Sequence, residues 1–460
     1  MPDILFHYER VNPTSWAYLS ALLTLALFFK FNRIWSVRNF DLFLLILLAP
    51  GLLLVQWAWE NAGVKENAIE IEYFGFLWLF SAGGLLLIRL LLDSAMVRRP
   101  LLEPNLNTPG LLFLGGSLLF FLMANVVTGK PNADDLSPAR QAAAVRTDDQ
   151  DGEADDANES FVTDGPGYWL LYSQPRIVTK QVIAAGGMQG EEVLADLEEQ
   201  ELKIQQATTR VMAILSHVMI VVGMIVIGYR HFENVTAGIA SAAMYLLLPY
   251  TALWTGSPQH ALPASLLVWS VVFYRRPLLA GMMIGLASGT IYYPAFLLPL
   301  WCSFYWERGV KRFLTGVVLM IGVLVLTMAF IATSSEEFFK HLLQMFGLRL
   351  PTTTHLGGIW LTWSPYYRFP ILAAFVALSI SFAIWPTRKN LASLISCTAA
   401  LMLAAQFWHA YDGGIYIAWY LPLLLLTIFR PNLEDRQALT KLSEGWWKVR
   451  QRRRKAQTEP

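Results

Sequence analysis

The carboxylates best placed for chemistry lie close together in the sequence, in the predicted loop between the second and third membrane spans. This loop contains Glu60, Glu66, Glu70 and Glu72. A carboxylate at an aqueous rim can act as a general base toward an attacking hydroxyl group. We therefore take Glu60, Glu70 and Glu72 as the candidate catalytic residues.

Other polar side chains lie at the ends of later predicted spans or in the loops beyond them, on the same side. The candidates for binding a substrate are Gln259, His260, Tyr292, Tyr293, Arg349, Arg368, His409 and Asp412. The arginines among them, together with Lys340, could hold a phosphate through charge-assisted hydrogen bonds. Charged side chains occur in any outer loop, so the hypothesis depends on these residues meeting in one place.

Ionisable residues are scarce inside the predicted spans. His217 lies near the centre of a span, where a histidine indicates either a functional site or a hydrogen bond between helices. Arg89 and Asp93 lie near the predicted cytoplasmic end of a span, where an arginine side chain can extend to the interface. An ion-coupled transporter usually keeps several paired acids or bases at mid-membrane, so this scarcity disfavours that class.

Sequence signals for cofactors are few. Cys302 and Cys397 both lie in apolar runs and indicate neither a disulfide framework nor a metal motif. The sequence has no Walker motif and no dinucleotide fingerprint in a suitable context, so direct use of ATP or NAD is not supported. No cofactor is evident, and a role for a divalent cation stays open.

The elements that position these residues must be membrane helices. Of the 460 residues, 55% are hydrophobic and only 15% are charged, whereas soluble domains average about 25% charged residues. The net charge of +1 gives no indication of nucleic acid as a partner. We predict an all-α integral membrane protein, a polytopic helix bundle of about 13 spans.

Hydropathy and the distribution of Lys and Arg predict the spans and their orientation. Besides the segment described next, the predicted spans are 15 to 31, 40 to 59, 73 to 92, 109 to 127, 210 to 228, 235 to 254, 260 to 274, 312 to 332, 370 to 385, 391 to 409 and 415 to 429. Short cytoplasmic loops collect positive charge. The basic loops therefore predict a multi-pass protein of the cell (inner) membrane, with its N-terminus outside and its C-terminus in the cytoplasm.

One apolar run does not fit a simple span. The stretch RRPLLAGMMIGLASGTIYYPAFLLPLWCSFYWERGVKR has no charged residue from Leu278 to Tyr305, which is too long for one span of about 20 residues and too short for two. Because both flanks are basic, we predict a short helical hairpin at 278–305 that turns near Tyr292 to Pro294. The freed backbone groups of the turn must be buried in protein or line a wet cavity. Three glycines on the first arm would let another helix approach closely: Gly281, Gly285 and Gly289.

The loops divide the chain into six predicted regions. These are an N-terminal membrane region of four spans (1–128), an acidic and partly disordered extracytoplasmic loop (129–209), a central membrane region with the hairpin (210–332), an extracytoplasmic loop with an interfacial helix (333–369), C-terminal spans (370–430) and a basic cytoplasmic tail (431–460). In the acidic loop, residues 131–160 have few large apolar side chains, which predicts disorder. Tyr168, Trp169 and Tyr172 are suited to the membrane interface. Residues 191–206 predict an acidic helix that leads into the next span.

The hairpin region also resembles a known family. The run RRPLLAGMMIGLASGTIYYPAFLLPLW, preceded by TGSPQHALPASLLVWSVVFY, resembles the mid-chain region of polytopic type C glycosyltransferases, especially the mannosyltransferase-like group that uses polyprenyl-phosphate sugars. The resemblance covers about residues 255 to 312. It implies a bundle of many helices with an extracytoplasmic catalytic face, a carboxylate in an early outer loop, and basic residues that hold the lipid phosphate.

The chain departs from this family at two points. A lysine that members often carry before the proline of the turn is Ile291 here, and the aspartate of the first outer loop is replaced by the glutamates named above. The leading expectation is transfer of a sugar from a lipid-phosphate donor, such as a polyprenyl-phosphate sugar, to an acceptor on the extracytoplasmic side, by a hexosyltransferase that contacts membrane lipids. A transporter or flippase would instead have a continuous cavity lined by His217. A non-catalytic membrane scaffold would have packed helices without an enclosed polar pocket.

Overall fold

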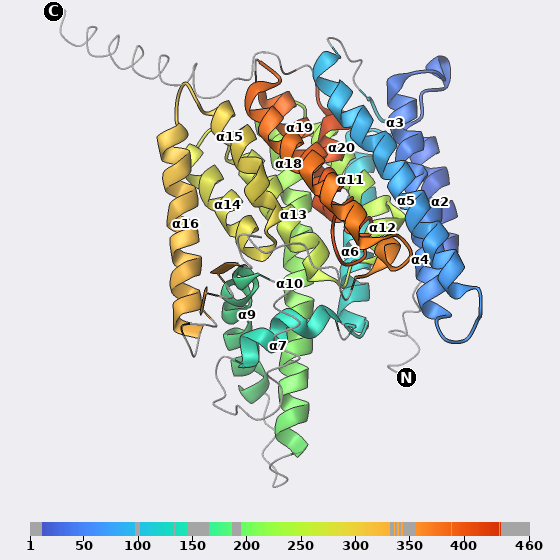
Figure 1. Ribbon diagram of the computed structural model, residues 1–460. Coiled ribbons are helices and arrows are strands. Elements are labelled where there is room, and N and C mark those ends of the chain that lie inside the picture. The colour runs from blue at the N-terminus through green and yellow to red at the C-terminus, as the bar shows by residue number, and fades with distance from the viewer. Residues whose placement is uncertain are drawn as a thin grey trace, which may run out of the picture.

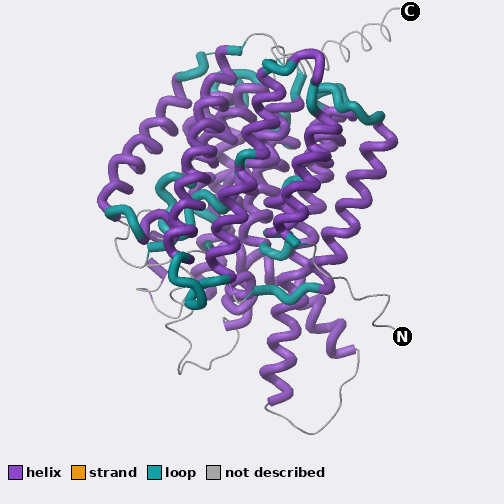
Figure 2. The backbone as a smooth tube through the Cα atoms, turned by 90° about the vertical axis from the view of Figure 1, so that its right-hand side faces the viewer, coloured by secondary structure: helices purple, strands orange, loops and turns teal. Residues whose placement is uncertain are grey.

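A computed structural model describes residues 12–96, 102–132, 134–144, 165–185, 195–331, 356–387 and 389–431, with the single positions 335, 338, 339, 342, 343 and 433. These residues form helices and short turns, and no strand occurs among them (Figures 1 and 2). The prediction of an all-α fold is confirmed for this part of the chain.

The helices occupy nearly the positions that hydropathy predicts. They are α2 (Pro13–Phe28), α3 (Val37–Ile46), α4 (Leu48–Glu60), α5 (Ala68–Leu91), α6 (Thr108–Thr128), α7 (Ser137–Ala144), α9 (Pro166–Ala185), α10 (Ala195–Arg230), α11 (Val235–Leu247), α12 (Pro249–Leu253), α13 (Pro258–Val272), α14 (Pro277–Thr290), α15 (Leu298–Phe304), α16 (Val310–Ile331), α18 (Arg368–Ile384), α19 (Leu391–Ala405) and α20 (Leu421–Phe429). By length and composition, six helical segments among the described residues could cross a membrane: 37–60, 68–91, 108–128, 199–230, 310–329 and 365–384.

Capping residues explain where several helices begin. The Asn107 side chain accepts a hydrogen bond from the Gly110 amide at the start of α6 (2.9 Å). Asn390 and Ser393 form a capping box at the start of α19. Such side chains satisfy amide groups that have no partner inside the helix. Each of these helices therefore starts at a position that the local sequence specifies.

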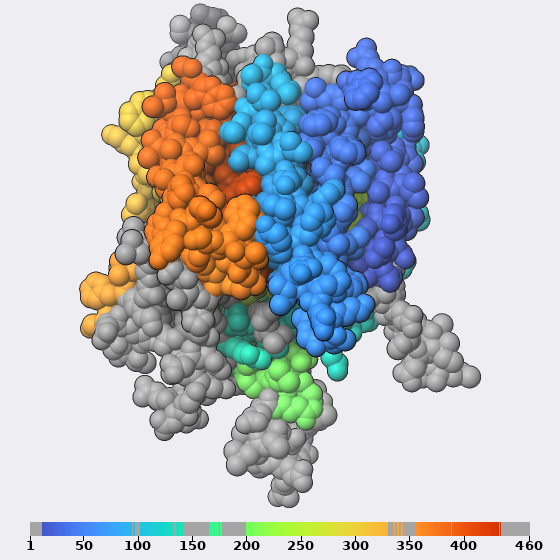
Figure 3. Space-filling view, turned by 45° about the vertical axis from the view of Figure 1, so that its right-hand side comes forward, coloured from blue at the N-terminus to red at the C-terminus, as the bar shows by residue number. Residues whose placement is uncertain are grey.

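The outer helices of the bundle expose large apolar side chains. Phe113 on α6 is 78% exposed, Val318 on α16 is 66% exposed and Ile380 on α18 is 57% exposed, whereas α11, α19 and α20 are almost wholly buried. Figure 3 shows one such outer face, formed by α18 (orange), α5 (light blue) and the N-terminal helices (dark blue). An apolar rim around a buried centre fits a bundle whose surroundings are lipid.

The predicted helical hairpin at 278–305 is present in the structure. α14 ends at Thr290, the chain turns at Ile291 and Tyr292, and the 3-10 turn Tyr293–Leu297 leads into α15. The Tyr305 hydroxyl donates a hydrogen bond to the backbone oxygen of Tyr274 (2.5 Å). Because Tyr274 precedes the first arm and Tyr305 follows the second, the run enters and leaves at the same end of the bundle.

The glycines of α14 pack against α16, as predicted. A Cβ atom added at Gly281 would lie 2.1 Å from the backbone oxygen of Phe313, and one added at Gly316 would lie 2.1 Å from that of Leu278. Glycine on both helices thus lets their backbones meet directly. This contact fixes the first arm of the hairpin to α16.

The start of α9 covers the tip of the hairpin. The Gly165 amide donates to the backbone oxygen of Thr290 (3.0 Å), one of the groups that the end of α14 leaves free. A Cβ atom at Gly167 would lie 2.7 Å from the carbonyl carbon of Gly289, so a side chain there would prevent this approach. The prediction that protein satisfies the turn's backbone is therefore confirmed at Thr290.

Two predictions for the acidic loop are wrong. Tyr168 and Tyr172 are fully buried against the rest of the protein, because α9 packs on α7, α10 and α14, so these side chains are not available to dock on a membrane. Residues 137–144, predicted to be disordered, form α7, whose Ala139 is buried in the same cluster. The helix predicted before the span at 210 is present as the first part of α10.

Two further predictions fall mostly on residues outside the described part of the chain. The interfacial helix predicted within 333–369 has only single described positions before residue 356. Of the basic tail, only residues 431 and 433 are described.

A buried ion network joins α3, α5 and the residue after α20 at the end opposite the hairpin tip. Asp41 accepts two hydrogen bonds from Arg89, at 2.5 and 2.9 Å. Asp93 accepts one from Arg89 (3.1 Å) and one from Arg430 (2.7 Å). The prediction that Arg89 extends to the interface is wrong: its side chain is 6% exposed, because Asp41 and Asp93 hold the guanidinium inside the bundle.

Candidate functional site

Three of the predicted substrate-binding residues form a chain of hydrogen bonds at the hairpin tip. The Tyr292 hydroxyl donates to the Tyr293 hydroxyl (2.8 Å), which lies 2.6 Å from Nδ1 of His409. Because Tyr293 accepts the proton of Tyr292, its own proton is available for His409 Nδ1. That arrangement leaves the imidazole proton on Nε2.

The second nitrogen of His409 is a donor without a partner. His409 Nε2 is buried and makes no hydrogen bond with any described residue. A buried donor that stays unsatisfied costs roughly 1–3 kcal/mol, so a native structure usually keeps one where a ligand or water completes it. His409 Nε2 is therefore the atom of this cluster that is best suited to receive a substrate oxygen.

A small cavity lies at this place. Its volume is about 50 Å³, and it is lined by Tyr168, Gln259, Ile291, Tyr292, Tyr293, His409, Ala410, Tyr411, Tyr416 and Trp419. A water molecule occupies about 30 Å³ in the liquid, so the space suits one or two waters. Residues from four separate segments meet here: the start of α9, the start of α13, the hairpin tip and the turn after α19.

The turn after α19 has a backbone shape that positions His409. Asp412 has a φ of 50° and Gly414 a φ of 104°, both in the left-handed region. The Gln406 side chain accepts a hydrogen bond from the Gly414 amide across the turn (3.0 Å). Trp360 Nε1 donates to the backbone oxygen of His409 (2.8 Å). These bonds hold the chain so that His409 faces the hairpin.

His260 lies beside this site in an aromatic stack. Its ring stacks between Trp254, at a centroid distance of 4.5 Å, and Tyr416, at 4.6 Å. Its Nδ1 lies 2.7 Å from the Tyr250 hydroxyl. Tyr416 also contacts the His409 ring edge-on at 4.9 Å. The two predicted histidines are therefore joined through one tyrosine.

Gln259 contributes its backbone as well as its side chain. Its carbonyl oxygen lies 3.3 Å from both the Tyr168 hydroxyl and Trp419 Nε1, which donate to it. Its side-chain amide donates to the Ser137 hydroxyl on α7 (3.2 Å). Gln259 thus ties the start of α13 to α7, α9 and the turn before α20.

Arg368 binds the backbone next to His409 and does not line the cavity. Its Nε and Nη2 donate to the backbone oxygen of Trp408, at 3.2 and 3.1 Å, and its guanidinium lies 5.9 Å from the centre of the Trp360 ring. The side chain is buried. Arg368 places a positive charge next to the residue that precedes His409. Arg349 and Lys340, the other candidates for holding a phosphate, lie outside the described residues.

The predicted catalytic carboxylates are not part of the cavity. Glu60 and Glu70 are exposed, and Glu60 accepts a hydrogen bond from Gln56 (2.8 Å). Glu72 is half-buried and accepts one from Trp59 (3.0 Å). The Trp59 ring contacts Trp254 at 5.9 Å, so Glu72 is linked to the His260 stack through two tryptophans. Among the candidate carboxylates, only Glu72 connects to the cluster in this way.

Asp412 lies close to the site, but its carboxylate lies against Gly357 and not in the cavity. A Cβ atom at Gly357 would lie 2.6 Å from its carboxylate oxygen, so Asp412 packs on the loop before Trp360. No carboxylate is among the residues that line the cavity. The described residues also contain no group of three or more His, Cys, Asp or Glu side chains that could hold a metal ion. The lining is made mainly of aromatic rings, together with His409, Gln259 and two apolar residues, Ile291 and Ala410.

No known family model, curated protein or solved structure matches this chain. Function must therefore be argued from the site itself.

His217 occupies a different place. It is buried between α10 and α11, where Nδ1 lies 2.9 Å from the Tyr245 hydroxyl. This is the hydrogen bond between helices that one interpretation of the sequence predicted.

Sequence reasoning missed the aromatic residues that surround the histidines. Tyr250, Trp254, Tyr416 and Trp419 each contact His260 or His409. A usable signal was present, because the run HAYDGGIYIAWY places four aromatic residues around the predicted outer turn. This run does not indicate which residues of α12 and α13 its aromatic side chains contact.

Proposed function

We propose that this protein transfers a sugar from a lipid-phosphate donor to an acceptor at the end of the bundle where the hairpin tip lies. In this proposal the protein has 13 spans in the cell (inner) membrane, with its N-terminus outside and its C-terminus in the cytoplasm. The hairpin tip then faces the extracytoplasmic side, where a polyprenyl-phosphate sugar would present its head group.

One observation carries the proposal: His409, whose buried Nε2 has no hydrogen-bond partner among the described residues, is one of the residues that line a small cavity of polar groups and aromatic rings. A leaving lipid phosphate develops negative charge on its bridging oxygen. A preorganised donor aimed at such an oxygen stabilises the transition state. Tyr292 and Tyr293 hold the imidazole in the tautomer that donates.

The surrounding residues divide the remaining tasks. The buried guanidinium of Arg368 adds positive potential next to His409 and favours the phosphate over a neutral group. One phosphate oxygen would take the place of a water in the cavity. Glu72, which Trp59 holds outside the cavity, would accept the proton of the attacking hydroxyl of an acceptor that binds between Glu72 and the cavity.

Replacing His409 by alanine is expected to lower the turnover number by about 100-fold, because loss of one such donor typically costs 10²–10³ in rate. The measurement is transfer of radiolabelled sugar from a synthetic polyprenyl-phosphate donor by the purified protein in liposomes. His217→Ala is the matched control, since His217 is another buried histidine bonded to a tyrosine. It should retain near-normal transfer.

Equal activity of His409→Ala and the unchanged protein would show that the site has another role. Absence of transfer by the unchanged protein, across a panel of lipid-linked sugars and acceptors, would reject the enzyme assignment. Loss of activity in His217→Ala together with normal activity in His409→Ala would instead favour a transport route through the bundle.

A further inference from the structure

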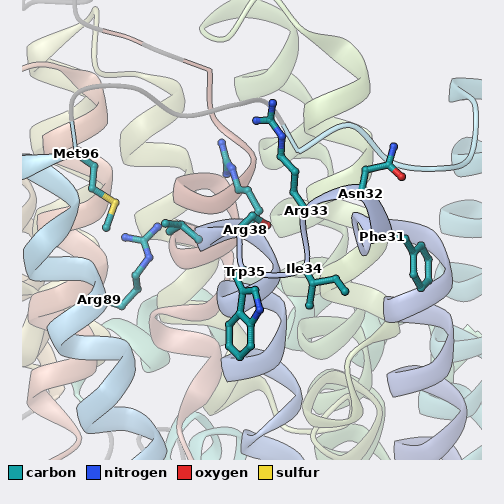
Figure 4. Close-up of a pocket in the computed structure, with 10 residues that line it drawn as sticks. Phe31, Asn32, Arg33, Ile34, Trp35, Arg38, Arg89 and Met96 are labelled. Atoms are coloured by element: carbon teal, nitrogen blue, oxygen red, sulfur yellow. The ribbon is translucent and has the colours of Figure 1, made fainter.

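The opposite end of the bundle contains a much larger pocket. Its volume is about 700 Å³, and it lies between the loop that joins α2 to α3 and the end of α5. Pockets of about 300–1,000 Å³ suit small ligands. Three arginines line it: Arg33, Arg38 and Arg89 (Figure 4).

One buried side chain builds the wall of this pocket. Asn39 Oδ1 accepts a hydrogen bond from the Lys30 backbone amide (3.0 Å), and the two hydrogens of its Nδ2 are shared among the backbone oxygens of Lys30, Arg33 and Ile34, which lie at 3.0 to 3.1 Å. The Asn39 amide therefore fixes the loop from residue 30 to residue 34. Arg33 is presented on a backbone that is already ordered, which lowers the entropy lost when a ligand binds.

The pocket lies over an excess of buried positive charge. The ion network contains three arginines, Arg38, Arg89 and Arg430, against two aspartates, Asp41 and Asp93, and all five side chains are buried. The five formal charges sum to +1, since 3 − 2 = 1, and exposed Arg33 raises the sum to +2. Burial, with a smaller effect of nearby Arg89, lowers the pKa of Arg430 to about 10. An anion in the pocket would offset this excess.

The geometry of the arginines suits a phosphate group. Figure 4 shows the guanidinium groups of Arg33 and Arg38 pointing to the same side of the pocket, with Arg89 beside Arg38 on the neighbouring helix α5. Arginine presents a planar fork of donors that matches phosphate oxygens.

Exposed apolar residues indicate that the phosphate belongs to a lipid. Trp35 is 99% exposed, and Phe31 and Ile34 are more than half exposed in the same loop. Tryptophan next to arginine at the end of a span is typical of the zone where head groups meet acyl chains. A free phosphate would make no use of these three side chains.

We propose that this pocket binds the phosphate of an anionic glycerophospholipid, with Arg33 and Arg38 on the phosphate and Trp35, Ile34 and Phe31 beside the acyl chains. Basic pockets between membrane helices at a cytoplasmic surface bind anionic head groups in the same way. The bound phosphate balances the ion network beneath it. This inference is independent of sugar transfer at the other end.

The test measures lipid binding to the full-length protein in neutral detergent by native mass spectrometry. Phosphatidylglycerol, phosphatidylcholine and inorganic phosphate are titrated separately, and phosphate is also tested as a competitor. We expect the protein to bind phosphatidylglycerol at least tenfold more tightly than phosphatidylcholine, and inorganic phosphate at millimolar concentration not to displace it. Arg33→Gln with Trp35→Ala should weaken phosphatidylglycerol binding about tenfold.

Two variants make the result interpretable. Arg33 is exposed and outside the ion network, so its replacement leaves the buried pairs intact and the protein folded. Arg308→Gln, an exposed arginine in the loop after the hairpin, is the matched control and should bind lipid normally. Equal affinity for both lipids, or equal loss in the control, would overturn the pocket assignment. Displacement of phosphatidylglycerol by inorganic phosphate would show that the pocket recognises phosphate alone and would overturn the proposal that its ligand is a lipid.

Discussion

Replacing Arg89 by leucine is expected to lower the free energy of unfolding by about 3–5 kcal/mol, the usual cost of removing one partner from a buried ion pair. Arg89 donates three hydrogen bonds to Asp41 and Asp93, and both carboxylates are almost fully buried. Without the guanidinium, two negative charges would remain inside the bundle with too few donors. The measurement is an unfolding titration in mixed detergent micelles.

A matched control distinguishes the stability lost by breaking the ion network from the effect of replacing any arginine by leucine. Arg230→Leu makes the same change at an exposed position at the end of α10 and should alter stability by no more than about 0.5 kcal/mol. Adding Asp41→Leu to Arg89→Leu should recover part of the loss, because a whole buried pair can be replaced by apolar groups at little cost. If Arg89→Leu were as stable as Arg230→Leu, the network would not contribute to stability.

Replacing Gly281 by alanine is expected to cost about 3 kcal/mol and to displace the hairpin. The added Cβ would lie 2.1 Å from the backbone oxygen of Phe313, and no change of rotamer can relieve a contact with backbone. Overpacking in a well-packed interior usually costs 1–3 kcal/mol, and this position should reach the upper end. The same unfolding titration measures the effect.

Two other glycines provide a graded comparison. A Cβ at Gly289 would meet the Leu324 side chain at 2.3 Å, which can move, so Gly289→Ala should cost less than Gly281→Ala. A Cβ at Gly322 on α16 would have no atom within 4 Å. Gly322→Ala should be neutral or slightly stabilising, since alanine favours a helix by about 1 kcal/mol. A uniform effect at all three positions would contradict direct backbone contact between α14 and α16.

The sequence was informative about features that are local in the chain. Helix positions follow from runs of apolar residues, and the hairpin follows from the two basic flanks of one uncharged run. Its tip was predicted within two residues because Pro294 interrupts a helix. The glycine contact was predicted because a spacing of four places all three glycines on one helix face.

The sequence predicted which residues belong to the site, but it did not predict which of them contact each other. Tyr293 and His409 are 116 positions apart, and nothing in either neighbourhood specifies the other. Glu60, Glu70 and Glu72 looked equivalent, and only the fold shows that Trp59 links Glu72 to the aromatic stack. The Asp41–Arg89 pair was missed because its partners are 48 positions apart, although the four-residue spacing of Arg89 and Asp93 was visible.

The ion network also has a consequence for how the protein is made. Arg430 lies 337 positions after its partner Asp93, and chains are synthesised from the N-terminus at about 5–20 residues per second. The helices that carry Asp41, Arg89 and Asp93 are therefore inserted roughly 20 to 70 seconds before the last partner emerges from the ribosome. During that time the early helices form an assembly intermediate whose charge balance differs from that of the finished bundle. Docking of α20 brings Arg430 to Asp93 and closes the network.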